Sequence, residues 1–271
     1  MKKENGNMRL EDYVIELRSK GKYTLNFQDL RQKFPERSAE ALRQAVFRLK
    51  ANKSLAHLRR EFYLIIPPEY SARPGLPLYL YIDDLMKYLG KDYYVGLFSA
   101  ASLHGASHQS PMTGDIVVSG PPVRPIESDN ISIRFYTKKS INQDHVVKMK
   151  SDSGYFNASS AELTAIDLIH YSSSWGIERV LTVLSELIES MKPSRLYNCA
   201  VVHNSAAVRK LGFLLDEYFM EKKLADKLYT LYSKNRSLNY IYLSPSEEKQ
   251  GVKNSKWMIV KNIEFSGEYD T

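Results

Sequence analysis

The stretch "RSAEALRQAVFRLKANKSLAHLRREFYLIIPPEY", residues 37–70, decides the fold of the amino-terminal part of the chain. Ser38 is a good helix cap, and the helix after it can continue to about Asn52. The segments "SLAHL" and "FYLII" are rich in strand-forming residues and are separated by a short turn at 59–61. A helix followed by a two-stranded hairpin is typical of the second half of a winged helix-turn-helix.

The residues before this stretch supply the first half of the motif. The spacing of apolar residues predicts a helix over 9–19, and "KYTL" can form a short strand. Asn26 is a plausible cap for a second helix, which Phe34-Pro35 would end. The order helix, strand, helix, helix, strand, strand fits within 70 residues. We therefore predict a winged helix-turn-helix domain over residues 1–70.

A proline-rich segment separates this domain from the rest of the chain. "PPEYSARPGLP", residues 67–77, contains four prolines and one glycine, so it cannot form a regular element. Beyond it, the patterns predict helices at "YIDDLMKYLG" and "YYVGLFSAASLHGAS", strands at "DIVVSG" and "ISIRFYTKK", several helices over 159–227, and strands at "YIYL" and "WMIV". The predicted fold class is α+β, with the winged helix-turn-helix followed by a larger mixed α/β domain over 78–271.

Charge separates the two predicted domains. The chain has a net charge of +7, and residues 1–70 hold 15 lysines and arginines against 9 acidic residues, which gives +6. A basic domain on a nearly neutral remainder predicts a polyanionic partner for that domain.

The single cysteine, Cys199, excludes an internal disulfide and a zinc site of several thiolates. No apolar run approaches 18 residues and the start does not resemble a secretory signal, so we expect a cytoplasmic protein away from membranes.

The helix after Ser38 has one apolar face and one polar face. On a wheel of 100° per residue, its inward stripe consists of Leu42, Ala45, Val46 and Leu49. The outward face carries arginine and glutamine, whose side chains can make bidentate hydrogen bonds to guanine and adenine. We assign base reading to Arg43 and Gln44, and phosphate contacts to Arg48, Lys50 and Lys53.

The hairpin and one aromatic residue complete the predicted DNA-binding set. Arg59 and Arg60 stand at the hairpin turn, where they can straddle a backbone or enter a minor groove. Phe47 can contact a thymine methyl group or pack back onto the core of its own domain. Arginine and glutamine are also good helix formers, so this helix alone is equally typical of a solvated face. Its position between a capped helix and a basic hairpin favours DNA binding.

Beyond the linker, "YIDDLMKYLGKDYYVGLFSAASLHGASHQSP" (Tyr81–Pro111) closely resembles the AbiEi family of antitoxins, from the type IV toxin–antitoxin systems of bacterial abortive infection. The first domain is similar to the family at "ALRQAVFRL" and at 59–70. Looser matches occur at "AELTAIDLI", "VLTVLSELIE" and "RKLGFLL". One departure is Glu61, where the family usually has glycine in the wing turn.

The resemblance implies a transcriptional repressor and antitoxin of phage defence, not an enzyme, with no cofactor or metal. It implies that the winged helix-turn-helix binds inverted repeats of double-stranded DNA in its own promoter. It further implies that the larger domain counteracts a nucleotidyltransferase toxin without a stable complex. A monomer that binds the repeats cooperatively would fit this role.

Three other interpretations stay open from the residues themselves. Asp115 and Lys138 loosely resemble a nuclease core, which would make the chain a magnesium-dependent DNA nuclease targeted by its winged helix. A winged helix can also bind protein, and Phe47 would then be the anchor. His104 and His108 have a spacing that can hold a metal, although no glutamate follows the first histidine as in zinc proteases.

Overall fold

The computed structural model describes residues 8–70, 75–106, 112–128, 131–203, 205–233, 239–245 and 247–265. The chain forms two compact units, the first from 1–94, 112–141 and 148–157, and the second from 95–111, 142–147 and 158–271. The first unit thus combines the amino-terminal 70 residues with segments from beyond the proline-rich linker. The domain limits predicted from the sequence, 1–70 and 78–271, remain a prediction.

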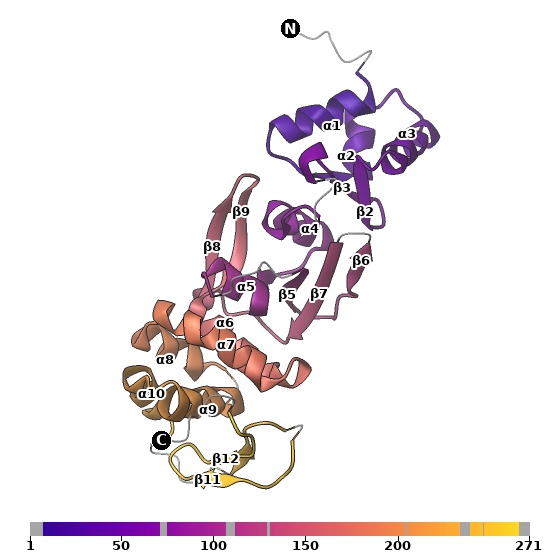
Figure 1. The fold of residues 1–271 in the computed structure, drawn as a ribbon. Helices are drawn as coiled ribbons and strands as arrows, with labels where there is room; N and C mark the ends of the chain where they lie inside the picture. Colours follow the sequence, from indigo (N-terminus) through magenta and orange to yellow (C-terminus); the bar gives the residue numbers. More distant parts are fainter. Residues whose placement is uncertain are drawn as a thin grey trace. The chain divides into compact units, whose positions relative to one another are not determined.

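The amino-terminal part of the first unit has the element order of a winged helix-turn-helix (Figure 1). Its strands form an antiparallel sheet in the order β1-β3-β2. The elements, in chain order, are α1 (Leu10–Ser19), β1 (Thr24–Asn26), α2 (Phe27–Lys33), α3 (Ala39–Ala51), β2 (Leu55–Arg59) and β3 (Phe62–Ile65). The α+β fold class and this order of elements agree with the prediction from the sequence.

Local chemistry explains where the helices of this part begin. The Asn26 side chain accepts a hydrogen bond from the Asp29 amide at 2.8 Å, and the Ser38 hydroxyl accepts one from the Ala41 amide at 3.1 Å. Each of these bonds satisfies an amide that has no partner within its helix. Both caps agree with the residues that the sequence indicates.

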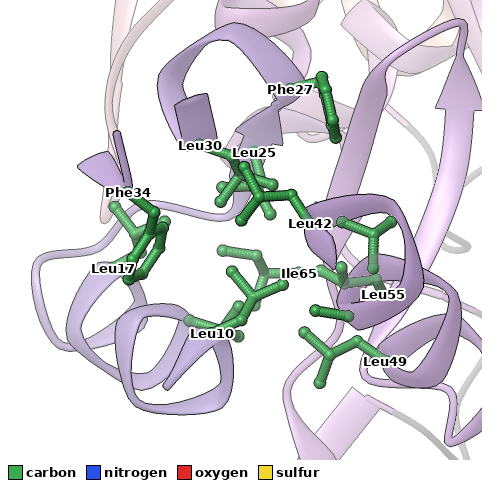
Figure 2. Packing of buried hydrophobic residues seen from close by; sticks show 13 residues of the cluster. Leu10, Leu17, Leu25, Phe27, Leu30, Phe34, Leu42, Leu49, Leu55 and Ile65 are labelled. Atoms are coloured by element: carbon green, nitrogen blue, oxygen red, sulfur yellow. The ribbon is translucent and has the colours of Figure 1, made fainter. Parts of the chain in front are cut away.

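One hydrophobic cluster holds the three helices and the sheet together (Figure 2). Figure 2 shows Leu42 and Leu49 of α3 pointing into this cluster, where Leu10 of α1 and Ile65 of β3 also lie. Leu42 and Ile65 are completely buried. Because the inward stripe of α3 is fixed by this packing, its opposite face is held outward.

The rest of the first unit is built on a six-stranded mixed sheet in the order β6-β7-β5-β4-β9-β8. β7 pairs with β5 in parallel and with β6 antiparallel. Helix α4 (Ile82–Leu89) precedes the sheet in the chain. The strands are β4 (Tyr93–Val95), β5 (Thr113–Ser119), β6 (Ile126–Ser128), β7 (Ile131–Lys138), β8 (Val146–Ser151) and β9 (Gly154–Ser159).

Four of the six strands of this sheet, β4, β6, β8 and β9, differ from the sequence prediction, which gave strands only at β5 and β7. The single helix expected over 93–107 is wrong, because the chain forms β4 and then the short helix α5 (Leu97–Leu103). The two elements are separated where Gly96 is extended and Leu97 has a φ of +54°. The sequence does not predict β8, since none of its side chains is buried and no apolar alternation marks it.

The second unit is mainly helical (Figure 1). A small sheet in the order β10-β12-β11 comes after its helices in the chain. Its later elements are α6 (Ala161–His170), α7 (Ile177–Leu187), α8 (Pro193–Val201), α9 (Ser205–Phe213), α10 (Lys222–Tyr229), β10 (Ile241–Tyr242), β11 (Val252–Asn254) and β12 (Ile259–Lys261). Across the described residues, no helix combines the length and apolar character needed to span a bilayer.

Trp257 joins the small sheet to the end of α9. A Cβ atom on Gly212 would lie 2.1 Å from a carbon of the Trp257 ring, so only glycine allows this close approach. The Trp257 indole N–H donates a hydrogen bond to Asp216 at 2.9 Å. The side chains of Trp257 and Asp216 are both almost completely buried.

Candidate nucleic-acid interface

The outer face of α3 carries the predicted DNA-binding residues in an exposed arrangement. Arg43, Gln44, Arg48 and Lys50 are all exposed, while the inward stripe of the same helix is buried. Phe47 is 66% exposed, which rules out the interpretation that it packs onto the core. The helix therefore presents two arginines, one lysine, an amide and an aromatic ring to the outside of the first unit.

Two of these side chains, Arg43 and Gln44, contact other side chains of the protein. The Arg43 guanidinium lies over the Phe27 ring, 5.3 Å from its centroid, and this contact limits the positions of its planar head group. The Gln44 amide donates a hydrogen bond to the Glu40 carboxylate at 3.1 Å. Reading a base with Gln44 would therefore require its amide to leave Glu40.

The wing strands add two residues that the sequence reasoning missed. His57 and Tyr63 face each other across β2 and β3, with their ring centroids 5.6 Å apart. Partial burial lowers the pKa of His57, and the charge of Lys50 on α3 lowers it further. Burial raises the pKa of Tyr63 and the charge of Glu61 raises it further, while the charge of Arg43 opposes part of this rise. The wing pair thus lies within electrostatic reach of two cations of α3, Lys50 and Arg43. The helical wheel of α3 alone gives no indication of this proximity.

Lys53 ends α3 in an exposed position. Its φ is +61°, and the Ser54 amide after it donates to the Leu49 carbonyl at 2.9 Å. A left-handed residue with such a bond is a common way to close a helix, although glycine usually occupies the position. Lys53 therefore places its charge just beyond the last turn of the helix.

The backbone conformation of the wing turn shows why glycine would fit better than Glu61, the one departure from the family pattern. Glu61 has a φ of +58°, a left-handed conformation that glycine adopts without a steric cost. A side chain there costs about 1–2 kcal/mol. Its carboxylate also adds a negative charge beside Arg60, which is exposed.

Replacing Glu61 by glycine should stabilise the protein by a few tenths to about 1 kcal/mol, because the relief of strain exceeds the added flexibility of the unfolded chain. Chemical denaturation would measure this change. Glu61→Ala is the matched control, since it removes the charge and keeps the strain. A gain with alanine equal to the gain with glycine would contradict the explanation by strain.

Arg59, which the sequence assigns to DNA phosphates, is engaged by the protein itself. Its guanidinium donates hydrogen bonds to the backbone carbonyls of Arg124 and Pro125, the latter at 3.4 Å. It also lies 6.0 Å from the centroid of the Phe135 ring. Burial lowers the pKa of Arg59, and the charge of Arg124 lowers it further. We therefore remove Arg59 from the set of candidate DNA contacts.

The pair behind the nuclease interpretation is not brought together. Asp115 is in register with Arg134 and lies 3.3 Å from its guanidinium, whereas Lys138 is in register with Ser119, four residues further along the same ladder. Four residues of parallel strand span about 13 Å. The Lys138 ammonium instead lies over the Tyr94 ring at 5.6 Å.

Only His104 of the histidine pair lies among the described residues. His104 Nε2 shares a hydrogen bond with the Ser159 carbonyl at 2.8 Å, and His108 lies outside the described residues. Within the described ranges, no group of three or more histidine, cysteine, aspartate or glutamate side chains could hold a metal ion.

Residues 94–217 match the family model of the AbiEi antitoxin C-terminal domain. This segment, slightly less than half of the chain, is similar to that antitoxin domain. The family resemblance seen in the sequence is thereby confirmed. This domain supports an antitoxin role in a toxin–antitoxin system and implies a toxin as the functional partner, and it argues for a non-enzymatic protein.

A solved structure shares the fold over nearly the whole length of this chain. The crystal structure of the Rv2827c protein from Mycobacterium tuberculosis matches with a TM-score of 0.67 at 16% sequence identity. The match covers 92% of this chain and 89% of that one. At this identity the likeness establishes the common fold alone. No curated protein matches the chain.

Proposed function

We propose that this protein is a type IV antitoxin that represses its own operon by binding inverted repeats in its promoter. The observation that carries the proposal is a set of unpaired cations. Among the described residues, no carboxylate lies within ion-pair distance of Arg43, Arg48, Lys50, Lys53 or Arg60. By contrast, Lys20 and Lys33, at the ends of the neighbouring helices, both pair with Glu16. Unpaired cations on one helix and its wing suit a phosphate backbone.

In the proposed complex, the element that carries each side chain decides which part of the DNA it contacts. α3 enters the major groove, where Arg43 and Gln44 contact base edges and Phe47 contacts a thymine methyl group. Arg48, Lys50 and Lys53 lie toward the end of the helix and neutralise phosphates, which sets the register without reading the sequence. Arg60 acts in the same way from the wing.

The antitoxin domain supplies the second half of the proposal. In this account it counteracts a nucleotidyltransferase toxin in the cytoplasm without forming a stable complex. The protein binds its two half-sites as monomers, with or without cooperativity. The AbiEi domain supports the antitoxin role, and the toxin's chemistry rests on the family resemblance.

The test is a titration of DNA from upstream of the protein's own gene, against a random duplex of equal length, at several salt concentrations. We expect tighter binding to the upstream DNA, with an affinity that falls steeply as salt rises. Lys53→Ala should weaken both duplexes alike and flatten the salt dependence by about one unit in log–log slope.

Two results would contradict the proposal. One is equal affinity for the upstream and random duplexes, which would remove the repressor function. The other is a tight complex with a protein partner whose affinity does not change with salt and is lost in Phe47→Ala. That result would favour the protein-binding interpretation of the winged helix.

A further inference from the structure

The wing is anchored to the loop between β5 and β6, beyond the proline-rich linker. The anchor is the Arg59 side chain, whose guanidinium donates to the carbonyls of Arg124 and Pro125. β2 and β6 lie side by side in the first unit (Figure 1). The wing therefore has a fixed neighbour in the part of the chain beyond residue 78.

A second set of contacts connects the wing turn to α4. The Tyr88 hydroxyl donates to the Arg60 carbonyl at 2.8 Å, and the rings of Phe62 and Tyr88 lie 4.8 Å apart. On the neighbouring strand β1, the Thr24 hydroxyl donates to Asp84 at 2.6 Å. These contacts keep the wing turn and the β5–β6 loop in one arrangement.

This arrangement brings a third arginine to the wing. Arg124 is exposed, and its charge lowers the pKa of Arg59, so the two guanidinium groups lie within electrostatic reach of each other. Among the described residues, neither Arg124 nor Arg60 has a carboxylate within ion-pair distance. Cations gathered without counter-charges repel one another, and a bound polyanion removes that repulsion.

We propose that Arg124 is a DNA phosphate contact, so that the DNA-binding surface is composite and extends from the wing onto the β5–β6 loop. The proposal rests on the proposed DNA-binding function. Arg59 acts as a positioning residue, because its guanidinium donates hydrogen bonds to the backbone of the loop that carries Arg124. The winged helix-turn-helix would then bind DNA less tightly without this loop.

The test is the Arg124→Ala variant of the full chain. Arg59 is held by the carbonyl of residue 124, which alanine retains, so the substitution removes the guanidinium and keeps the anchor. We expect several-fold weaker binding to operator and random duplexes alike, with the log–log salt slope reduced by about 0.9. Arg124→Lys should recover most of the affinity, because a phosphate accepts either cation.

Lys150→Ala is the matched control. Lys150 is exposed on β8, at the edge of the sheet opposite β6, so its loss removes the same charge far from the wing. An unchanged slope in Arg124→Ala, with wild-type DNA binding intact, would overturn the composite surface and leave the repressor function standing. An equal drop of the slope in Lys150→Ala would overturn it as well. No binding by the wild-type protein would overturn both proposals.

Discussion

Replacing Asp216 by alanine is expected to lower the free energy of unfolding of the second unit by about 1–3 kcal/mol. The Asp216 side chain is 1% exposed. It accepts hydrogen bonds from Lys222 at 2.7 Å and from the Trp257 indole at 2.9 Å, and it lies 2.7 Å from the Lys256 ammonium. Removal of the carboxylate leaves two cations without their buried counter-charge and an indole N–H without an acceptor.

Asp226→Ala is the matched control for this effect. Asp226 is 68% exposed and its carboxylate contacts Lys256 at 3.4 Å, so its removal should cost about 0–1 kcal/mol. Chemical denaturation of both variants, monitored by tryptophan fluorescence, would separate the two outcomes. A loss in Asp226→Ala as large as in Asp216→Ala would contradict the role of burial.

The same carboxylate should make the second unit sensitive to acid. Burial alone would raise the pKa of Asp216, but the hydrogen bonds from Lys222, Lys256 and Trp257 outweigh it and lower the pKa to about 2. A carboxylate with a lowered pKa stabilises the fold above its unfolded value of 3.8, and this stability is lost as the pH falls toward 2. We expect Asp216→Ala to lack this part of the decline between pH 4 and pH 2.

Asp216 also ties the end of the antitoxin domain to the carboxyl-terminal segment of the chain. The family match ends at residue 217, one residue beyond Asp216, whereas Trp257 and Lys256 come from the segment after the match. Trp257 further packs on Gly212, within the matched residues. The ion pairs of the buried Asp216 and the packing of Trp257 on Gly212 therefore both help to hold the carboxyl-terminal sheet on the matched segment.

The amino-terminal fold was predictable because its signals are local. Asn26 and Ser38 cap helices that begin next to them, and the inward stripe of α3 is given by helical spacing alone. Asp216 carries no such signal, since "LLDEY" is equally typical of an exposed carboxylate at a helix end. Its partners stand 6 to 41 residues away in the chain, and no local pattern links them.

The candidate DNA site was predictable only in part, for the same reason. The helical wheel gives the exposed residues of α3, because it places Arg43 and Arg48 outside once Leu42 is inside. A position at a basic turn favours a DNA contact for Arg59, yet its acceptors are backbone carbonyls 65 and 66 residues away. Every residue has a backbone carbonyl, so the sequence does not indicate which carbonyls accept hydrogen bonds from Arg59. Neither the anchor of Arg59 nor the position of Arg124 could therefore be predicted.

Replacing Arg43 by alanine is expected to cost about 1–3 kcal/mol of binding to the operator, a loss of roughly 5- to 150-fold. On a random duplex the loss should be smaller, since only one charge is removed there. The difference between the two duplexes measures base reading. Gel-shift titrations at matched salt, with a permuted base at each operator position, would show one position at which the preference disappears.

Arg43→Lys decides between a base contact and a phosphate contact. Lysine keeps the charge but has no planar fork, so it cannot reproduce a bidentate contact with guanine. If Arg43 reads a base, the lysine variant should lose most of the operator preference while it binds random DNA nearly as well as the wild type. If Arg43 contacts a phosphate, lysine should restore both affinities, and base reading would then fall to Gln44.

In that case Glu40→Ala, which frees the Gln44 amide and removes a negative charge from the outer face of α3, should increase the preference for the operator over random DNA. An operator preference that survives in both Arg43→Ala and Gln44→Ala would refute the assignment of base reading to this face of α3.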